Sequence, residues 1–473
     1  MSIKKNKIAL VISDGVGFRN YIMSNFLSKA QEQFDEILIY SALPKSYYDD
    51  YIIDNCVIVD LEDYRETSKT WFFRKLKEVA HLQNHKKENY GIRANLIRNY
   101  PTARSKRALL IKLIFAWTNF FNSEKWINQY YKFQQKSFKS NVTTKRYISL
   151  LKKHSPDLVY FTHQRPPYIA PLIYASNIEK IKTATFIFSW DNIPSKGRMS
   201  GDFNYYFVWS HLMKEELLSF YVNIKPEQVI VVGTPQFEPY VLDKYKIELN
   251  QYMSKFDLDT TKKTICYSCG DVSTSKNDPL YIKTIAEAIS KNKIIEPVNL
   301  IVRTSPAEDS SRFKSLKDNY QFIKWNYPKW TLSRDTHQET WSQRIPTVED
   351  IVDLRGLLTY SDIAINMCST MSLDAMFFNK PVINPVFGNE TNGLYNDQKY
   401  LKYQHYSRVV DSDAVAVVRT AEALINEINL LLENPDNRLE AQKELLELQI
   451  SYPLQGTSER IVTTINQCIE ESV

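Results

Sequence analysis

"NMCSTMSLDAMFFNKPVINP", residues 366–385, is the stretch of the chain that most clearly predicts its fold. A short apolar strand over 362–366 ends at Cys-Ser-Thr, a helical pattern follows, and a second apolar strand covers 381–386. A strand, a helix and a strand in such close succession predict a parallel βαβ unit. A helix that only packs needs neither two hydroxyls at its start nor Asp374 one turn later, so this turn is a candidate binding site.

The same alternation of strand and helix patterns continues along both halves of the chain. In the first half, for example, a buried strand is predicted over 7–13 and a helix over 18–34. We therefore expect an α/β protein of two doubly wound, Rossmann-like domains facing a central cleft, because a chain of 473 residues is too long for one core. The expected parts are a first domain over 1–242 with a basic, aromatic helical insertion at 65–146, a hinge over 243–263, a second domain over 264–455, and a closing helix over 456–473.

Composition and apolar runs predict a cytoplasmic globular protein. Hydrophobic residues make up 43% and charged residues 24% of the chain. The apolar run at 8–12 is too short for a signal peptide, and the run at 108–117 is too short to span a membrane. Five scattered cysteines do not form a disulfide framework.

Positive charge is concentrated in one segment. Residues 65–146 carry 19 Lys/Arg and 4 Asp/Glu, a local charge of +15, whereas the whole chain has +6 and the remainder therefore −9. Together with its aromatic residues, this charge predicts contact with an anionic acceptor or an anionic membrane surface. The alternative is a solvated basic insertion that only packs on the first domain. Nucleic acid is not expected as a partner, because no recognised binding motif accompanies the charge.

Several polar residues follow predicted strands of the first domain, at the edge where open α/β sheets bind ligands. Asp14 and His163 are candidate catalytic bases, although a capping or structural role explains each equally well. Asp191 is a further catalytic candidate. The glycine pair at 15 and 17 is not a dinucleotide fingerprint, since Asn occupies position 20 where the third glycine would stand. The candidate contacts to acceptor or sugar are Gly17, Trp190 as a stacking face, and Asn192.

The second domain offers candidates for binding a diphosphate. Ser369 and Thr370 stand where a helix N-terminus could hold a phosphate, or where one of them simply caps the helix. Arg303 ends a strand and could clamp a diphosphate, or form a salt bridge instead. Gly270 follows a strand and lies in a loop rich in hydroxyls, and Asp374 could bind a ribose. The Cys-x-x-Cys pair at 266–269 lies in a strand and lacks a second pair, so no metal site is expected.

Four motifs resemble the GT-B superfamily of nucleotide-sugar glycosyltransferases. They are GTPQFE (233–238), RTSP (303–306), STMSLDAMFFNKPVI (369–383) and QGTSERI (455–461). In detail they are similar to the bacterial branch that contains CDP-glycerol glycerophosphotransferases and surface-polysaccharide sugar transferases. The chain departs from the glycerophosphotransferases in having no His-Gly pair, which favours sugar transfer.

The resemblance implies a site as well as an activity. It implies that a nucleotide-sugar donor binds the second domain at Gly270, Arg303, Ser369, Thr370 and Asp374, and that a glycan or lipid-linked acceptor binds the first domain. It also implies catalysis without a metal or other cofactor.

The resulting prediction is a glycosyltransferase that builds a surface glycan such as capsule or lipopolysaccharide, peripherally bound at the inner membrane face. Asp14 or His163 would deprotonate the acceptor if the reaction inverts configuration, and would only position it if the reaction retains configuration. A CDP-polyol phosphotransferase and a non-catalytic protein that binds anionic polymers are the alternatives.

Overall fold

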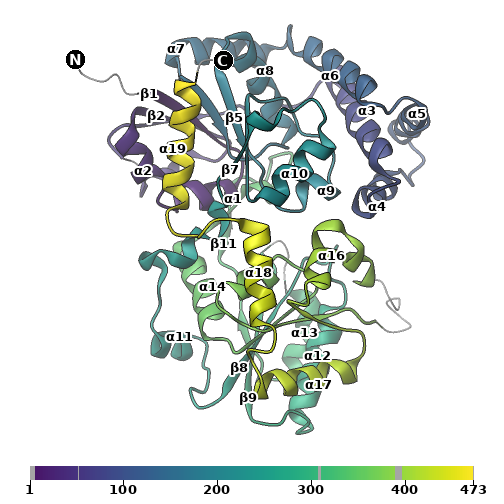
Figure 1. The fold of residues 1–473 in the computed structure, drawn as a ribbon, viewed down its shortest axis with the longest axis vertical. Coiled ribbons are helices and arrows are strands. Elements are labelled where there is room, and N and C mark those ends of the chain that lie inside the picture. The colour runs from purple at the N-terminus through teal and green to yellow at the C-terminus, as the bar shows by residue number, and fades with distance from the viewer. Residues whose placement is uncertain (1–5, 52, 307–309, 389–396, 472–473) are drawn as a thin grey trace. The chain divides into compact units, whose positions relative to one another are not determined.

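The computed structural model describes the chain except residues 1–5, 52, 307–309, 389–396 and 472–473 (Figure 1). The chain divides into two compact units, and each is made of segments that are separate in the sequence. The first unit contains 1–238, 332–345 and 449–473. The second unit contains 239–331 and 346–448. The short segment 332–345 therefore belongs to the first unit, although the residues on both sides of it belong to the second unit.

The first unit is built on a seven-stranded parallel sheet with strand order β3-β2-β1-β4-β5-β6-β7. Strand β1 lies between β2 and β4 and is covered on both faces, so its apolar run from Ile8 to Ile12 is fully buried. β1 pairs with β4 in a register that sets Val11 opposite Phe161. The strands are β1 (Asn6–Ile12), β2 (Phe34–Ser41), β3 (Cys56–Asp60), β4 (Leu158–Phe161), β5 (Lys182–Phe186), β6 (Tyr205–Val208) and β7 (Val229–Val231).

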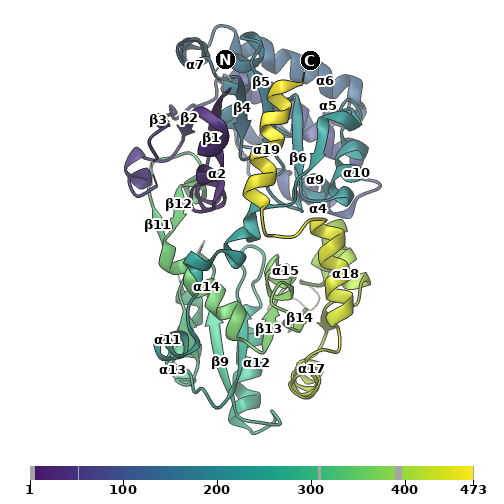
Figure 2. The same ribbon diagram turned by 60° about the vertical axis from the view of Figure 1, so that its left-hand side comes forward.

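The single helix predicted over 18–34 is wrong. The structure has a short helix α1 (Gly15–Gly17), a π-helical turn over Phe18–Ile22 and a separate helix α2 (Phe26–Gln33). The closing helix α19 (Thr457–Glu470) packs beside α2 (Figures 1 and 2). The remaining helices around this sheet are α8 (Ala170–Ile178), α9 (Asn192–Ser195) and α10 (His211–Phe220).

Five helices lie between β3 and β4 and include the basic segment. Helix α3 packs against α4, α5 and α6, so these four form one layer of the first unit (Figure 1). Thr67, Asn89 and Ser105 cap three of them, each accepting a hydrogen bond from a first-turn N–H group. The helices are α3 (Ser68–His85), α4 (Tyr90–Asn99), α5 (Lys106–Phe120), α6 (Glu124–Phe138) and α7 (Val142–His154).

The second unit is built on a six-stranded parallel sheet with strand order β10-β9-β8-β13-β14-β15. Its strands are β8 (Lys263–Ser268), β9 (Val298–Arg303), β10 (Lys324–Asn326), β13 (Ile363–Asn366), β14 (Val382–Pro385) and β15 (Ala416–Val418). Its helices are α11 (Leu249–Lys255), α12 (Asp278–Ser290), α13 (Lys314–Asn319), α14 (Val348–Tyr360), α15 (Met371–Met376), α16 (Gln404–Asp411), α17 (Ala421–Glu433) and α18 (Leu439–Ile450).

Two connecting segments contain secondary structure of their own. The span predicted as a hinge contains α11, whose Tyr252 and Met253 are buried beside Leu357. The short strands β11 (Trp330–Leu332) and β12 (Arg344–Pro346) pair at the two ends of the 332–345 segment. In the described part of the chain, no helix is both long and apolar enough to cross a membrane.

Candidate functional site

Asp14 and His163 form a hydrogen-bonded pair at the carboxyl edge of the first sheet. Asp14 follows β1 and His163 follows the neighbouring strand β4. The Asp14 Oδ2 atom lies 2.9 Å from His163 Nδ1, and both side chains are buried. The imidazole stacks on Phe188, with ring centroids 3.9 Å apart. These contacts hold the ring in one orientation.

The pKa values of the pair determine the histidine tautomer. Burial alone would raise the pKa of Asp14, but hydrogen bonds from His163, Gly17 and Ser13 and the interaction with the imidazole lower it on balance. Burial lowers the pKa of His163, although Asp14 opposes this effect. An ionised carboxylate only accepts hydrogen bonds, so Nδ1–H of His163 is the donor. The lone pair of the neutral ring is then on Nε2, which has no hydrogen-bond partner among the described residues.

The predicted sugar contact Gly17 is buried and contacts Asp14 of this pair. Its N–H group donates to Asp14 Oδ1 at 2.8 Å, which makes Asp14 the N-cap of α1. A Cβ atom at Gly17 would lie 2.8 Å from Thr162 Oγ1. Glycine is therefore needed here for close packing that positions Asp14.

A cavity of about 540 Å³ opens at the same edge, and His163 lines it. The basic insertion contributes one wall through α3 and α4, and the loops after β4 and β5 contribute another. Both the candidate base and part of the positive charge noted in the sequence therefore meet in one cavity. Its principal polar lining is Arg74, Lys75, Glu78, Asn95, Arg98, His163, Arg165, Asp191, Asn192, Lys196, Arg198 and Glu339.

Two of the three candidates at 190–192 reach the cavity. Asp191 pairs with Lys196 at 3.1 Å, and its Oδ1 atom accepts a hydrogen bond from the Asn192 amide. Asn192 in turn accepts from Gln164 at 3.0 Å. Trp190, by contrast, is only 3% exposed and is not one of the residues that line the cavity, so its ring offers no accessible stacking face.

The cavity also contains residues that no sequence motif predicts as part of a site. Arg165 lies two residues after His163, a proximity that was a usable signal. Glu339 and Trp341 reach the cavity from the 332–345 segment, and the Trp341 ring lies 6.4 Å from that of His163. No local pattern identifies these two, because they lie far away in sequence from the sheet edge that they cover.

In the second unit, the predicted nucleotide-binding residues follow adjacent strands. The register sets Ser268 of β8 opposite both Arg303 of β9 and Asn366 of β13. Gly270, Arg303, Ser369 and Thr370 therefore belong to one sheet edge, as expected from the alternation of strands and helices.

In the turn before α15, Ser369 forms hydrogen bonds with other residues of the same turn. Ser369 N–H donates to Asn366 Oδ1 at 3.0 Å, and Ser369 Oγ accepts from Met371 N–H at 3.1 Å. Thr370 occupies the N-cap position with helical backbone angles, and its side chain makes no capping hydrogen bond. Ser369 thus has the capping role that the sequence left open for one of the hydroxyls.

Arg303 takes part in a buried ion pair. Its guanidinium donates to both oxygens of Asp350, at 3.0 and 2.9 Å, and to Asn326 Oδ1 at 2.8 Å. Asp350 also accepts from Trp330 Nε1 at 2.8 Å. Arg303 therefore forms a salt bridge, which was the alternative to diphosphate binding. This salt bridge lies in the interior of the unit rather than on its surface.

Gly270 and Asp374 also have protein partners. Gly270 N–H donates to Asp278 Oδ2 at 3.0 Å, and its carbonyl accepts from Arg312 at 2.7 Å. Burial raises the pKa of Asp278 to about 7, against the hydrogen bonds and the charge of Arg312 that lower it. Asp374 is buried and accepts a hydrogen bond from the Tyr240 hydroxyl.

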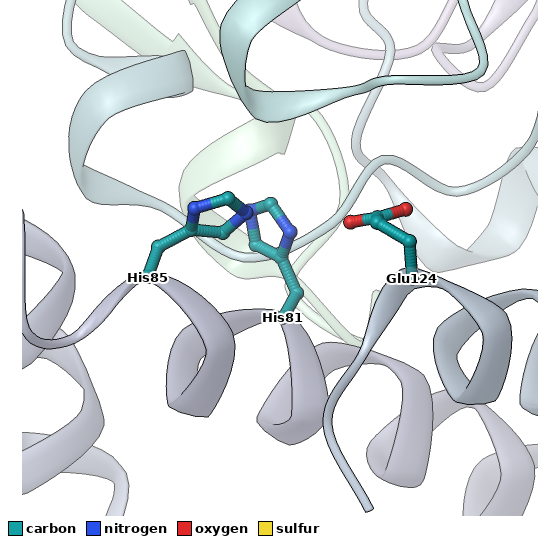
Figure 3. Close-up of side chains that lie close together, drawn as sticks. All are labelled: His81, His85 and Glu124. Atoms are coloured by element: carbon teal, nitrogen blue, oxygen red, sulfur yellow. The ribbon is translucent and has the colours of Figure 1, made fainter.

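A cluster in the insertion resembles a metal-ligand set (Figure 3). His81 and His85 lie one turn apart on α3, and Glu124 begins α6; their candidate ligand atoms all lie within 4.8 Å of one another. However, Arg198 donates to Glu124 Oε1 at 2.9 Å and lies 3.5 Å from His81 Nδ1. A divalent ion would be repelled by this guanidinium. The donor set therefore fits a metal poorly.

Known structures share this architecture across nearly the whole chain. A structure from Listeria monocytogenes covers 99% of this chain and 98% of its own, with 11% identity and a TM-score of 0.56. A glycosyltransferase from Rickettsia africae covers 99% and 100%, with 14% identity and a TM-score of 0.52. The chain has the GT-B fold. A UDP-GlcNAc 2-epimerase from Neisseria meningitidis bound to UDP-GlcNAc covers 98% and 100%, with 14% identity and a TM-score of 0.51.

The GT-B fold thus occurs in a transferase and an epimerase at similar distance from this chain. No protein-family model and no curated protein matches the sequence. Since a fold can host several activities, the activity has to be argued from the site.

Proposed function

We propose that this protein is a GT-B glycosyltransferase that moves a sugar from a nucleotide-sugar donor to a growing surface glycan, without a bound metal. The single observation that carries the proposal is the buried Asp14–His163 pair, whose histidine lines the cavity of the first unit and whose Nε2 atom has no hydrogen-bond partner among the described residues. A neutral imidazole held by a carboxylate is suited to removing a proton from an acceptor hydroxyl.

The geometry of the pair supports a separate role for each residue. His163 is the base, because its Nε2 atom accepts the hydroxyl proton while Nδ1–H stays bound to Asp14. Asp14 orients the ring and stabilises the imidazolium that forms when the proton arrives. Asp191 and Asn192 line the cavity beside them and are the proposed contacts to the acceptor. This assignment corresponds to a reaction that inverts configuration at the transferred sugar.

The donor is proposed to bind the second unit at the edge formed by the ends of β8, β9 and β13. Gly270, Ser369 and Thr370 are the proposed contacts to the diphosphate. Arg303 and Asp374 are proposed to support that edge through Asp350 and Tyr240, while Asp374 retains the proposed contact to ribose. Cations and oriented backbone N–H groups can stabilise a diphosphate leaving group, so chelation with EDTA is expected to leave the rate unchanged.

The basic insertion is proposed to bind the inner membrane face, beside anionic lipids. Helix α5 exposes a row of large apolar side chains, with Leu113 59% and Phe120 79% exposed, and Lys106, Arg107 and Lys112 lie on the same helix. Apolar side chains flanked by cations are typical of helices that lie in the membrane interface. The other exposed apolar residues of this surface are Ile97, Tyr100, Leu109, Leu110, Trp117 and Trp126.

A UDP-sugar 2-epimerase is the second candidate, because several structures of similar architecture are UDP-GlcNAc 2-epimerases. A CDP-polyol phosphotransferase, suggested by the sequence motifs, is a third. The test is incubation with UDP-, GDP-, CDP- and CMP-linked donors, with and without glycan acceptors, followed by mass spectrometry and NMR. Acceptor-dependent release of nucleotide with a new glycosidic bond supports the proposal. A change of sugar configuration with the nucleotide still attached would replace it with the epimerase.

A further inference from the structure

Arg165 differs from the other cations that line the cavity. Among the described residues its guanidinium makes no hydrogen bond and no ion pair, and the side chain is half-buried. Arg74 pairs with Glu66 at 2.6 Å, Lys196 pairs with Asp191 at 3.1 Å, and Arg198 pairs with Glu124 at 2.9 Å. A half-buried guanidinium without a protein partner keeps its N–H donors available to an anionic ligand.

The main chain that carries Arg165 is held firmly. Ser200 Oγ donates to the carbonyl oxygens of Arg165 and Pro166, at 2.5 and 2.9 Å, and Ser200 N–H donates to the carbonyl of Gln164 at 3.0 Å. Pro166 and Pro167 follow directly and restrict the backbone further. The backbone of Arg165 is therefore fixed before any ligand binds, and this lowers the entropic cost of binding.

Arg165 lines the same cavity as two groups suited to a sugar. One is His163, which is 4% exposed and whose Nε2 atom has no hydrogen-bond partner among the described residues. The other is Trp341, whose ring is 49% exposed and can stack on the apolar face of a sugar. The candidate base His163, the aromatic ring of Trp341 and the unpaired cation of Arg165 therefore line one cavity.

We propose that the acceptor is an acidic glycan, and that Arg165 binds an anionic substituent, a phosphate or a carboxylate, on the sugar whose hydroxyl faces His163. This inference rests on the proposed function, since it names the acceptor class of the same cavity. Guanidinium and either anion match in a bidentate geometry.

The other charges of the cavity do not cancel this preference. Among the described carboxylates that line the cavity, Glu339 is the one that forms no ion pair; burial raises its pKa, and Arg165 opposes that rise. Glu78 and Asp191 are neutralised by Arg74 and Lys196 respectively. A protonated Glu339 would be a hydrogen-bond donor to the same anion.

The test is calorimetric titration of the whole protein with glucose 6-phosphate, glucuronate, glucose and UDP. Arg165→Gln is expected to weaken binding of the two acidic sugars about 10- to 100-fold, and to leave glucose and UDP unchanged. Arg165→Lys should recover part of the loss for the phosphate. Lys132→Gln, which removes an exposed charge of the same insertion outside the cavity, is the matched control.

The outcomes separate this inference from the proposed function. Equal affinity for glucose and the acidic sugars overturns the inference, while glycosyl transfer to a neutral acceptor would leave the proposed function standing. A loss confined to UDP would assign Arg165 to the donor diphosphate and overturn the inference as well. Binding of acidic sugars that depends on Arg165, without turnover of any donor, would support the anion site and contradict the transferase.

Discussion

His163 donates a hydrogen bond from Nδ1 to a carboxylate oxygen of Asp14, over 2.9 Å and across 149 residues of sequence. The two side chains meet because β1 and β4 are neighbours in the sheet and each residue follows its strand directly. The contact converts two separate candidate bases into one unit with a single free nitrogen.

The pair predicts a specific dependence of activity on pH. Burial lowers the pKa of His163 below its usual 6.5, so the imidazole is neutral and competent as a base above that pH. We expect kcat/KM to be constant above about pH 6.5 and to fall as the pH decreases through the lowered pKa. His163→Gln should reduce kcat about 10²- to 10⁴-fold.

Asp14→Asn tests the coupling within the pair. Because the Asp14 carboxylate raises the pKa of His163, its loss should move the acidic limb of the profile to lower pH while reducing kcat. His154→Gln, at a histidine outside the cavity, is the control and should leave the profile unchanged. An unshifted limb in Asp14→Asn would contradict the assignment of the base.

We expect Arg303→Ala to lower the free energy of unfolding, and to weaken donor binding only indirectly. Removing the guanidinium leaves Asp350 buried without its cation, which costs about 3–5 kcal/mol. Urea unfolding followed by fluorescence measures this loss. Lys7→Ala breaks a much more exposed pair with Glu36 and should leave the midpoint of urea unfolding nearly unchanged. Unchanged stability with lost donor affinity would instead make Arg303 a direct diphosphate ligand.

Gly15→Ala should loosen the 332–345 segment from the first unit. A Cβ atom at position 15 would lie 1.7 Å from the carbonyl oxygen of Arg344, and neither backbone can move cheaply. We expect faster tryptic cleavage at Arg334 and Arg344, together with reduced activity, because Trp341 and Glu339 would leave the cavity. Gly197→Ala, where the nearest atom would be 3.8 Å away, should not change the rate of cleavage.

The exposed apolar row of α5 predicts binding to anionic vesicles. The protein should sediment with phosphatidylglycerol vesicles more than with phosphatidylcholine vesicles, and added salt should weaken the interaction. The double substitution Leu113→Glu and Phe120→Glu should reduce binding at least about 10-fold. Leu448→Glu changes an equally apolar side chain, 46% exposed on α18 of the second unit, and should have no effect.

Much of the architecture could be predicted because parallel strands are buried on both faces and read as short apolar runs. The strands β1, β13 and β14 correspond closely to the strands predicted over 7–13, 362–366 and 381–386. The region 18–34 could not be predicted, since nothing in its apolar pattern indicates a π-helical turn followed by a break. The strands β11 and β12 are too short for any periodicity to be detected.

The sequence by itself determined which residues stand at the ends of strands, and hence that Asp14, His163, Gly270, Arg303 and Ser369 belong to sheet edges. That information is local, because the end of an apolar run marks where a strand leaves the core. Only the tertiary structure decided the partners: Asp14 with His163, Arg303 with Asp350, and Trp341 beside the first sheet. Such pairings depend on the strand order and on which unit the 332–345 segment joins. Local sequence patterns indicate neither of these.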